Sequence, residues 1–272
     1  MFVDITQLHG DNARLMPRVK VVLEYDGSNY VGWQIQQNGP SVQGRLQRAL
    51  QELIGDPVAV YAAGRTDSGV HATGQVVMFD SPKQLPTKAY WMGLNGLLPD
   101  DIAVVTAEEC DPAFDPRRWA RGKRYRYRIS NRRSRSPMRR HTHWEIFQPL
   151  NLAAMQECVD PLLGKHDFSG FRASDCQAAH ANRELTRLEL TGTVGDEISL
   201  VIEGTAFLKH MVRNIMGSVV EVGRGKEPPS FLATILSGRD RTRAGQTAPP
   251  QGLTLEAVFY GDGPREGDDD DD

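Results

Sequence analysis

Residues 123–130 read KRYRYRIS, and this stretch decides how the chain must fold. Successive side chains of a β-strand point to opposite faces, so the two tyrosines and the isoleucine share one face and the three arginines share the other. The apolar face needs cover from a second layer, whereas the arginine face can meet water or an anion. The stretch therefore predicts a strand in a sheet that is backed on one face.

Strand and helix patterns continue on both sides of this stretch. Ser41 and Asn151 are typical N-caps, and each precedes apolar residues at helical spacing. The predicted segments are residues 19–26, 42–53, 58–64, 74–79, 87–97 and 101–109 before a linker near 110–117, and 123–130, 152–163, 185–192, 197–204, 206–222, 230–237 and 252–260 after it. Their order predicts two related α+β units, each an antiparallel sheet backed by helices.

The composition is that of a globular protein. Hydrophobic residues make up 39% of the 272 residues and charged residues 25%, with a mean hydropathy of -0.45. No apolar run approaches the ~20 residues of a membrane span, and the N-terminal residues lack the apolar core of a secretory signal. The three cysteines lie far apart without a CxxC pair, which favours reduced thiols. We therefore expect a cytoplasmic protein with no membrane segment.

Charge is distributed unevenly along the chain. Residues 262–272 hold seven acids and one arginine, and their net charge of -6 leaves +3 for the rest of a chain whose total is -3. Residues 117–140 contain twelve lysines or arginines and no acid, with Trp119, Tyr125 and Tyr127 among them. Positive charges suit phosphates and aromatic rings suit bases, so this run favours nucleic acid as the partner, with a solvated charged face as the alternative.

Asp67 is the first candidate for chemistry. It lies in GRTDSGVHA, residues 64–72, between two strand patterns, and Arg65 lies two residues before it. A nearby cation keeps a carboxylate ionised, and an ionised, oriented aspartate can act as nucleophile or base. The structural alternative is an Asx turn. An aspartic protease would need a second Asp-Ser/Thr-Gly sequence, which the chain lacks.

The predicted helix 206–222 is apolar around most of its surface. Its polar stripe consists of His210, Arg213, Asn214 and Gly217. An arginine on a mostly buried helix needs a partner or a cleft. We predict that Arg213 faces a cleft and meets Asp67 there; the alternative is an ion pair with a purely structural acid.

Neither a metal nor a cofactor is expected. None of the seven histidines has ligand spacing with a cysteine or glutamate. The chain also lacks a Walker loop, a GxGxxG motif and a Gly-x-Ser-x-Gly motif, so nothing indicates a nucleotide cofactor or a serine hydrolase.

Seven stretches in order resemble the tRNA pseudouridine synthase A family, whose members isomerise uridines at positions 38 to 40 of the tRNA anticodon arm. They are YDGSNYVGWQIQ (25–36), SVQGRLQRAL (41–50), GRTDSGVHATGQV (64–76), NGLLPDDIAV (95–104), KRYRYRI (123–129), HDFSGFR (166–172) and KHMVRNIMGSVVEVGRG (209–225).

This resemblance implies roles for individual residues. Asp67 matches the catalytic nucleophile of the family, and Arg213 matches an arginine that pairs with it. Tyr125 matches the ring that packs against the target base, and Arg65 matches an arginine that holds the flipped-out nucleotide. Phe168 and Phe171 fall in a matching loop near the tRNA.

The resemblance also implies an architecture. It predicts two ferredoxin-like units whose antiparallel sheets join across a central basic cleft, with helices on the outer face. The family is a homodimer that needs no cofactor, and both subunits grip one tRNA. The expected divisions are an N-terminal extension, a domain with the Asp67 loop, a second α+β domain and a disordered acidic tail, at residues 1–17, 18–112, 113–261 and 262–272.

A second class of function stays open beside the enzyme. A protein that keeps the fold and binds RNA without catalysis would share the basic run, but such a homologue should have lost Asp67, Tyr125 or Arg213. All three are present. The sequence therefore favours the enzyme.

Overall fold

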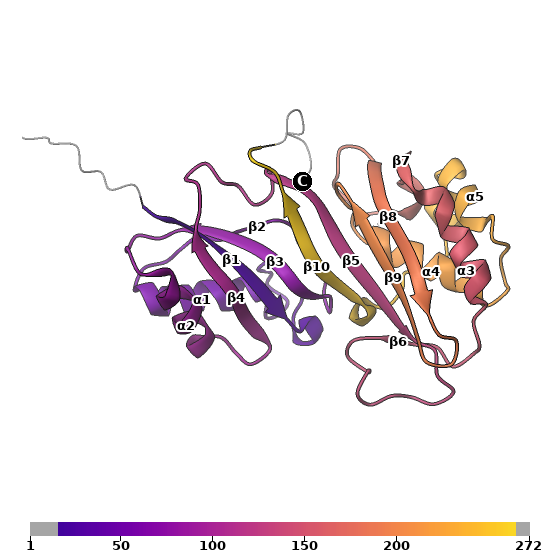
Figure 1. Ribbon diagram of the computed structural model, residues 1–272, viewed down its shortest axis with the longest axis horizontal. Helices are drawn as coiled ribbons and strands as arrows, with labels where there is room; N and C mark the ends of the chain where they lie inside the picture. The colour runs from indigo at the N-terminus through magenta and orange to yellow at the C-terminus, as the bar shows by residue number, and fades with distance from the viewer. Residues whose placement is uncertain (1–15, 265–272) are drawn as a thin grey trace, which may run out of the picture.

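The structure is a computed structural model that describes residues 16–264. In this range the chain forms a ten-stranded mixed sheet and five α-helices (Figure 1). The strands are β1 (Arg18–Tyr25), β2 (Tyr61–Ala62), β3 (His71–Asp80), β4 (Ile102–Glu109), β5 (Ala120–Ser130), β6 (Trp144–Glu145), β7 (Gly164–Asp167), β8 (Asn182–Gly192), β9 (Glu197–Gly204) and β10 (Leu253–Tyr260). The helices are α1 (Val42–Ile54), α2 (Thr87–Leu97), α3 (Leu152–Val159), α4 (Met211–Gly223) and α5 (Phe231–Gly238).

The helix ends follow from local chemistry. Ser41 caps α1 by accepting the Gly44 N–H at its Oγ, and Asn151 caps α3, as predicted. α3 ends earlier than predicted, at Val159, because Pro161 lacks an N–H and the chain continues there as a short 3-10 turn, Asp160–Leu162. α4 begins at Met211 rather than near residue 206, since the residue before it has a positive φ and cannot belong to a helix.

The two halves join through a parallel strand pair. Along the order β4-β1-β3-β10-β5-β9-β8-β7 every pairing is antiparallel except β3 with β10, where Thr254 lies opposite His71 and Leu255 opposite Ala72. The prediction of purely antiparallel sheets was therefore wrong at the junction. The last strand takes its direction from its antiparallel pairing with β5, and this direction makes it parallel to β3.

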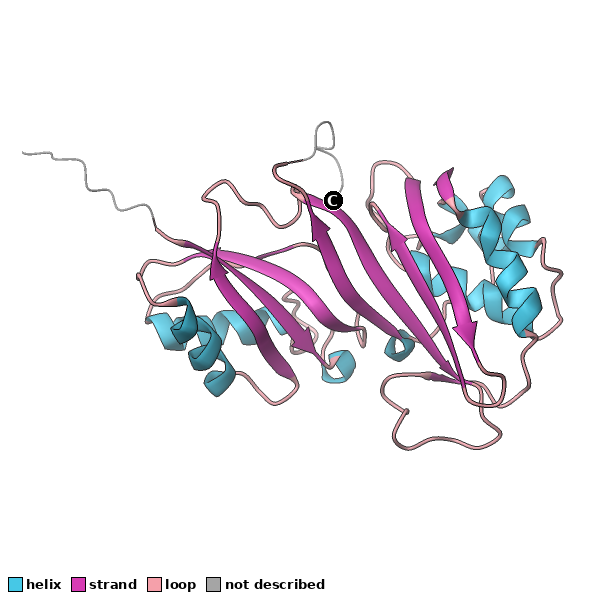
Figure 2. Cartoon of the chain, in the orientation of Figure 1, coloured by secondary structure: helices cyan, strands magenta, loops and turns pink. Residues whose placement is uncertain are grey.

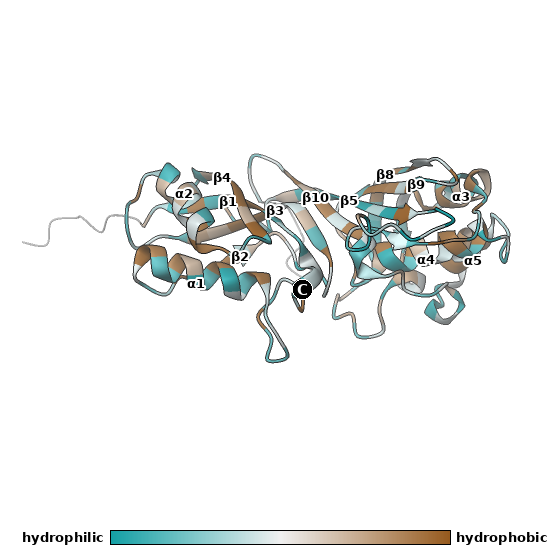
Figure 3. Ribbon diagram, turned by 90° about the horizontal axis from the view of Figure 1, so that it is seen from below, coloured by the Kyte–Doolittle hydropathy of each residue, from teal (hydrophilic) through white to brown (hydrophobic). Residues whose placement is uncertain are grey.

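The helices cover one face of the sheet in two groups. α1 and α2 lie beside β4-β1-β3, while α3, α4 and α5 lie beside β5-β9-β8-β7 (Figures 1 and 2). One continuous apolar core runs through both halves, and it includes Tyr125, Tyr127 and Ile129 of β5. Hydrophobic and hydrophilic residues alternate along the strands (Figure 3), as expected for a sheet covered on one face.

Ion pairs occupy the other face of the sheet. Arg124 contacts Glu203 of β9 at 2.7 Å, and Arg126 and Arg128 contact Glu256 of β10 at 2.5 and 3.5 Å. The predicted alternation of β5 is confirmed. Its arginines are neutralised by acids from neighbouring strands, however, and they point away from the face that carries the tyrosines.

Some predictions fall on other parts of the chain. The N-terminal extension and the acidic tail lie outside the described residues, apart from 16–17 and 262–264. The domain boundary at 112/113 falls between β4 and β5 and stays a prediction. No helix within residues 16–264 is long and apolar enough to cross a membrane.

Gly74 allows β3 and β10 to approach each other. A Cβ at this position would lie 2.2 Å from the backbone oxygen of Glu256. We expect Gly74→Ala to lower the free energy of unfolding by about 1–3 kcal/mol, because the crowded junction must shift. The measurement is urea unfolding. The matched control is Gly96→Ala in α2, where a Cβ meets nothing within 4 Å and no loss of stability is expected. Equal stability of parent and Gly74→Ala would contradict the tight junction.

Candidate functional site

The loop that carries Asp67 is fixed from behind by the segment after β1. The Trp33 N–H donates to the Thr66 carbonyl at 3.0 Å, and the Thr66 hydroxyl lies 2.8 Å from the buried hydroxyl of Tyr25. The Val70 N–H closes the turn on the Asp67 carbonyl at 3.1 Å. The turn is thus closed by backbone atoms rather than by the carboxylate, in contrast to an Asx turn.

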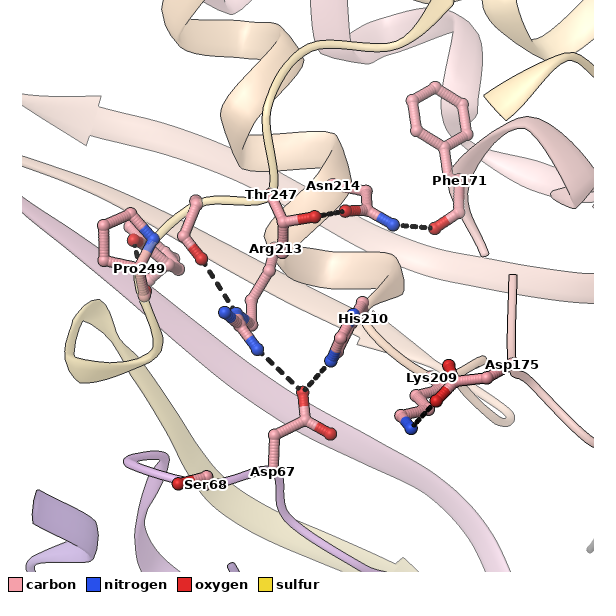
Figure 4. Close-up of polar contacts among 12 residues, drawn as sticks. Asp67, Ser68, Phe171, Asp175, Lys209, His210, Arg213, Asn214, Thr247 and Pro249 are labelled. Atoms are coloured by element: carbon pink, nitrogen blue, oxygen red, sulfur yellow. Dashed lines mark hydrogen bonds and ion pairs between the residues drawn. The ribbon is translucent and has the colours of Figure 1, made fainter. Parts of the chain in front are cut away.

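Arg213 of α4 reaches the Asp67 carboxylate across the junction of the two halves (Figure 4). Its Nη1 donates to Asp67 Oδ2 at 3.2 Å, and its Nε donates to the Ala248 carbonyl at 2.8 Å. The side chains of Asp67 and Arg213 are 26% and 12% exposed. The predicted contact is present, and the oxygen of Asp67 that Arg213 does not engage is left for other partners.

The contact also places the helices relative to the site. Because α4 supplies a side chain to Asp67, the helices and Asp67 lie on the same face of the sheet. The resemblance placed the helices on an outer face, away from the cleft, and that arrangement was wrong. α4 packs on one face of the sheet, so Arg213 can reach the junction only on that face.

His210 is a site residue that sequence reasoning did not assign. Its Nε2 lies 3.5 Å from Asp67 Oδ2, and its side chain is 28% exposed (Figure 4). Burial lowers its pKa below the usual 6.5; Asp67 works against this shift, while Arg213 and Lys209 add to it. The sequence held one signal, since His210 and Arg213 stand three apart on one polar stripe.

A loop packed on α4 holds Arg213 in place. A Cβ at Gly217 would lie 1.7 Å from the Gln246 carbonyl oxygen, so only glycine lets the loop approach so closely. The Ala248 N–H donates to the Arg213 carbonyl at 3.1 Å, and the Thr247 hydroxyl donates to Asn214 Oδ1 at 2.7 Å. The helix and the loop therefore fix the guanidinium from both sides.

The other predicted site residues differ in their exposure. Tyr125 is 8% exposed and packs edge-on against Phe207 with ring centroids 5.0 Å apart. Burial raises its pKa well above the ordinary value of 10, and its neighbours Tyr25 and Asp67 add to the rise. Arg65 is exposed and makes no hydrogen bond or ion pair with any residue that the structure describes. Its charge is therefore available to a ligand.

Phe168 and Phe171 are fully buried, with ring centroids 6.3 Å apart. Their rings belong to the apolar core, and their roles near the tRNA stay predictions. The Phe171 carbonyl accepts a hydrogen bond from Asn214 Nδ2 at 2.7 Å, which links this segment to α4 beside Arg213.

No group of three or more His, Cys, Asp or Glu side chains within residues 16–264 is placed to hold a metal ion.

Known proteins similar to this chain are consistent with one another. A family model described as tRNA pseudouridine synthase matches residues 21–117 and 159–261. A protein of Myxococcus xanthus described as "tRNA pseudouridine synthase A" is 64% identical over 249 residues, which cover 92% of this chain and 94% of that protein. One of the same description from Geotalea uraniireducens is 43% identical over 245 residues, 90% of this chain and 100% of that protein.

Among solved structures, that of the archaeal box H/ACA sRNP Nop10-Cbf5 complex matches with a TM-score of 0.37 and 8% identity, over 90% of this chain and 49% of that chain. A likeness this weak carries no weight for fold or function.

The charges around His210 give opposite effects in two variants. Asp67→Asn removes the negative charge that favours the imidazolium, so the pKa of His210 should fall further. Arg213→Gln removes a positive charge that opposes the imidazolium, so the pKa should rise. An NMR titration of the ring C–H resonances measures both. Asp196→Asn, whose carboxylate pairs with Arg139, is the control and should leave the titration of His210 unchanged. An identical titration of His210 in the parent and in all three variants would contradict the placement of Asp67 and Arg213 beside the ring.

Proposed function

Since the chain belongs to the tRNA pseudouridine synthase family, we propose that it isomerises uridine to pseudouridine at positions 38, 39 and 40 of the tRNA anticodon stem-loop, with Asp67 as the nucleophile. The observation that carries this proposal is the partly exposed Asp67 carboxylate, held by Arg213 at the junction of the two halves. A carboxylate fixed by an arginine and open on one side can act as a nucleophile.

The reaction begins with extrusion of the target base. A uracil in a stem is out of reach of a protein carboxylate, so it must be flipped out at a cost of a few kcal/mol. Asp67 then attacks C6 of the base or C1′ of the ribose. The N1–C1′ bond breaks and its electron pair stays on the base. The base turns, and C5 bonds to C1′, which releases Asp67 in the case where the carboxylate had attacked C1′. The final step removes the hydrogen from C5. No redox step and no energy input is needed.

The surrounding residues have separate tasks. Arg213 holds the attacking carboxylate in one orientation through its contacts with Asp67 and the Ala248 carbonyl. The Tyr125 ring packs against the target base, and its hydroxyl stays protonated because burial raises its pKa. Arg65 is exposed in the loop that also carries Asp67, and it is available to hold the flipped-out nucleotide.

The loop between β5 and β6 supplies cations for tRNA binding. Arg132, Arg133 and Arg135 are exposed, unlike the paired arginines of β5. Asn131 fixes the start of this loop by donating to the Ile146 and Gln148 carbonyls at 3.0 and 2.7 Å. Charges in a fixed loop can contact phosphates and so offset the cost of base flipping.

The assembly belongs to the same proposal. On the family resemblance, the protein is a cytoplasmic homodimer that grips the anticodon arm of one tRNA with both subunits and uses no cofactor. Sedimentation equilibrium of the full chain tests the dimer. A monomer at the concentrations that support full activity would contradict it.

Asp67→Asn tests the nucleophile. The purified parent protein, treated with a chelator and given no nucleotide, should release tritium from C5-labelled uridines of tRNA. The Asn variant should bind tRNA as the parent does and release no label above background, because a lost covalent catalyst is not replaced by binding.

The matched control for this experiment is Asp80→Asn. It makes the same charge change at an acid that pairs with Arg18, and it should keep the parent rate. Turnover by Asp67→Asn would overturn the mechanism. A parent that binds tRNA and releases no label would favour a non-catalytic RNA-binding protein.

The loop cations should contribute affinity rather than chemistry. We expect the pair Arg132→Ala and Arg133→Ala to weaken tRNA binding and to reduce the slope of log K against log salt by up to about one unit per lost phosphate contact. Single-turnover rates at saturating tRNA should stay unchanged. Arg126→Ala is the comparison, because it breaks an ion pair with Glu256 on the other face and should keep the salt slope. A collapsed rate with unchanged affinity in the loop variant would place these arginines in the active site.

A further inference from the structure

The backbone of His210 lies in a region that histidine seldom occupies. Its φ is 61° and its ψ is 2°, in the left-handed region, and Arg239 is the other non-glycine residue with positive φ within residues 16–264. Glycine or asparagine would adopt this conformation at lower cost. Strain of this kind persists where the surrounding structure requires it, and it is common at functional sites.

Helix capping does not explain the histidine. His210 occupies the N-cap position of α4, but its side chain makes no capping hydrogen bond. The ring instead points to Asp67, with Nε2 3.5 Å from Oδ2, as Figure 4 shows. The strained backbone therefore directs an imidazole to the carboxylate rather than to the end of the helix.

The proposed reaction needs a proton acceptor at this place. When C5 bonds to C1′ it still carries its hydrogen, and it then lies close to the carboxylate that attacked the nucleotide. A base must be within hydrogen-bond reach of that hydrogen, directly or through one water. His210 meets this condition because its ring contacts the same carboxylate.

The other polar groups at the site are unsuited to the task. Arg213 is a permanent cation that already donates to Asp67 and Ala248. Lys209 is paired with Asp175 at 2.5 Å. The Tyr125 hydroxyl holds its proton firmly because it is buried. His210 remains as the group with a nitrogen lone pair to offer.

We infer that His210 is the base that removes the C5 proton of the target uridine, a role that rests on the proposed isomerisation. The C5–H bond breaks and the proton moves to an imidazole nitrogen. The electron pair of that bond becomes the C5=C6 double bond and displaces a pair from C6, onto N1 or back onto Asp67 according to which atom the carboxylate attacked. N1, which has lost its bond to C1′, takes a proton from water in either case, and the imidazolium returns its proton to water.

The charges that face His210 fit this task. Burial, Arg213 and Lys209 lower the pKa of His210, while Asp67 and Asp175 work against this shift, so the net effect favours the neutral imidazole. A neutral imidazole can accept the proton. Asp67 then lies beside the imidazolium that forms and stabilises it.

The test compares single-turnover rates of the full chain on tRNA with hydrogen or deuterium at C5 of uridine. We expect His210→Asn, which tolerates the backbone conformation, to slow the reaction by on the order of 10²-fold or more. A primary isotope effect larger than that of the parent should appear, because C5–H cleavage becomes rate-limiting, and added imidazole should restore part of the rate. His210→Gly, which relaxes the backbone, should show the same two changes. The control Arg239→Asn, at the other left-handed position, should keep the parent rate and isotope effect.

Two outcomes would overturn the role of His210. One is a His210→Asn variant as fast as the parent; the other is a slow variant with the isotope effect of the parent, which would make His210 a positioning residue. A parent protein that releases no C5 hydrogen would instead overturn the isomerisation itself, and with it this role.

Discussion

The ion pair between Asp67 and Arg213 is the constraint on which the arrangement of the two halves depends. The two residues are 146 positions apart in the sequence. Asp67 lies in the loop before β3 and Arg213 lies on α4, so they belong to different halves of the fold. Arg213 stands on a mostly apolar helix and is 12% exposed, so its charge needs a close partner. That partner lies across the junction. The short parallel pairing of β3 with β10 therefore has to hold the halves at one separation, and Gly74 makes this close contact possible.

The fold separates the positive charge of residues 117–140 into two groups. Arg124, Arg126 and Arg128 of β5 meet Glu203 and Glu256 from the adjacent strands and are largely neutralised on the face without helices. Arg132, Arg133 and Arg135 of the following loop remain exposed. The basic run looks uniform in the sequence. In the structure, these β5 arginines form ion pairs within the sheet, and the exposed arginines of the following loop are open to a polyanion.

The site is organised before any substrate arrives. α4 and the loop packed on it hold the guanidinium of Arg213, while the segment after β1 holds the Asp67 loop from the other half. His210 completes the set through a strained backbone at the start of the same helix. Three side chains held from the two halves thus converge with little freedom, which is what the proposed nucleophile and the proposed base require.

The sequence by itself determined the elements of this protein and several of their faces. Periodicity assigned the five helices, the strands other than β6 and β7, and the two faces of β5, because side-chain direction repeats along a local backbone. The cost of a buried charge pointed from Arg213 to Asp67. Tertiary structure alone decided the parallel junction, the central place of β10, the acids that meet the β5 arginines and the burial of Phe168 and Phe171. It also decided the direction of the His210 ring. Each of these depends on contacts between segments far apart in the chain, and local periodicity carries no information about which distant strand or side chain becomes the neighbour.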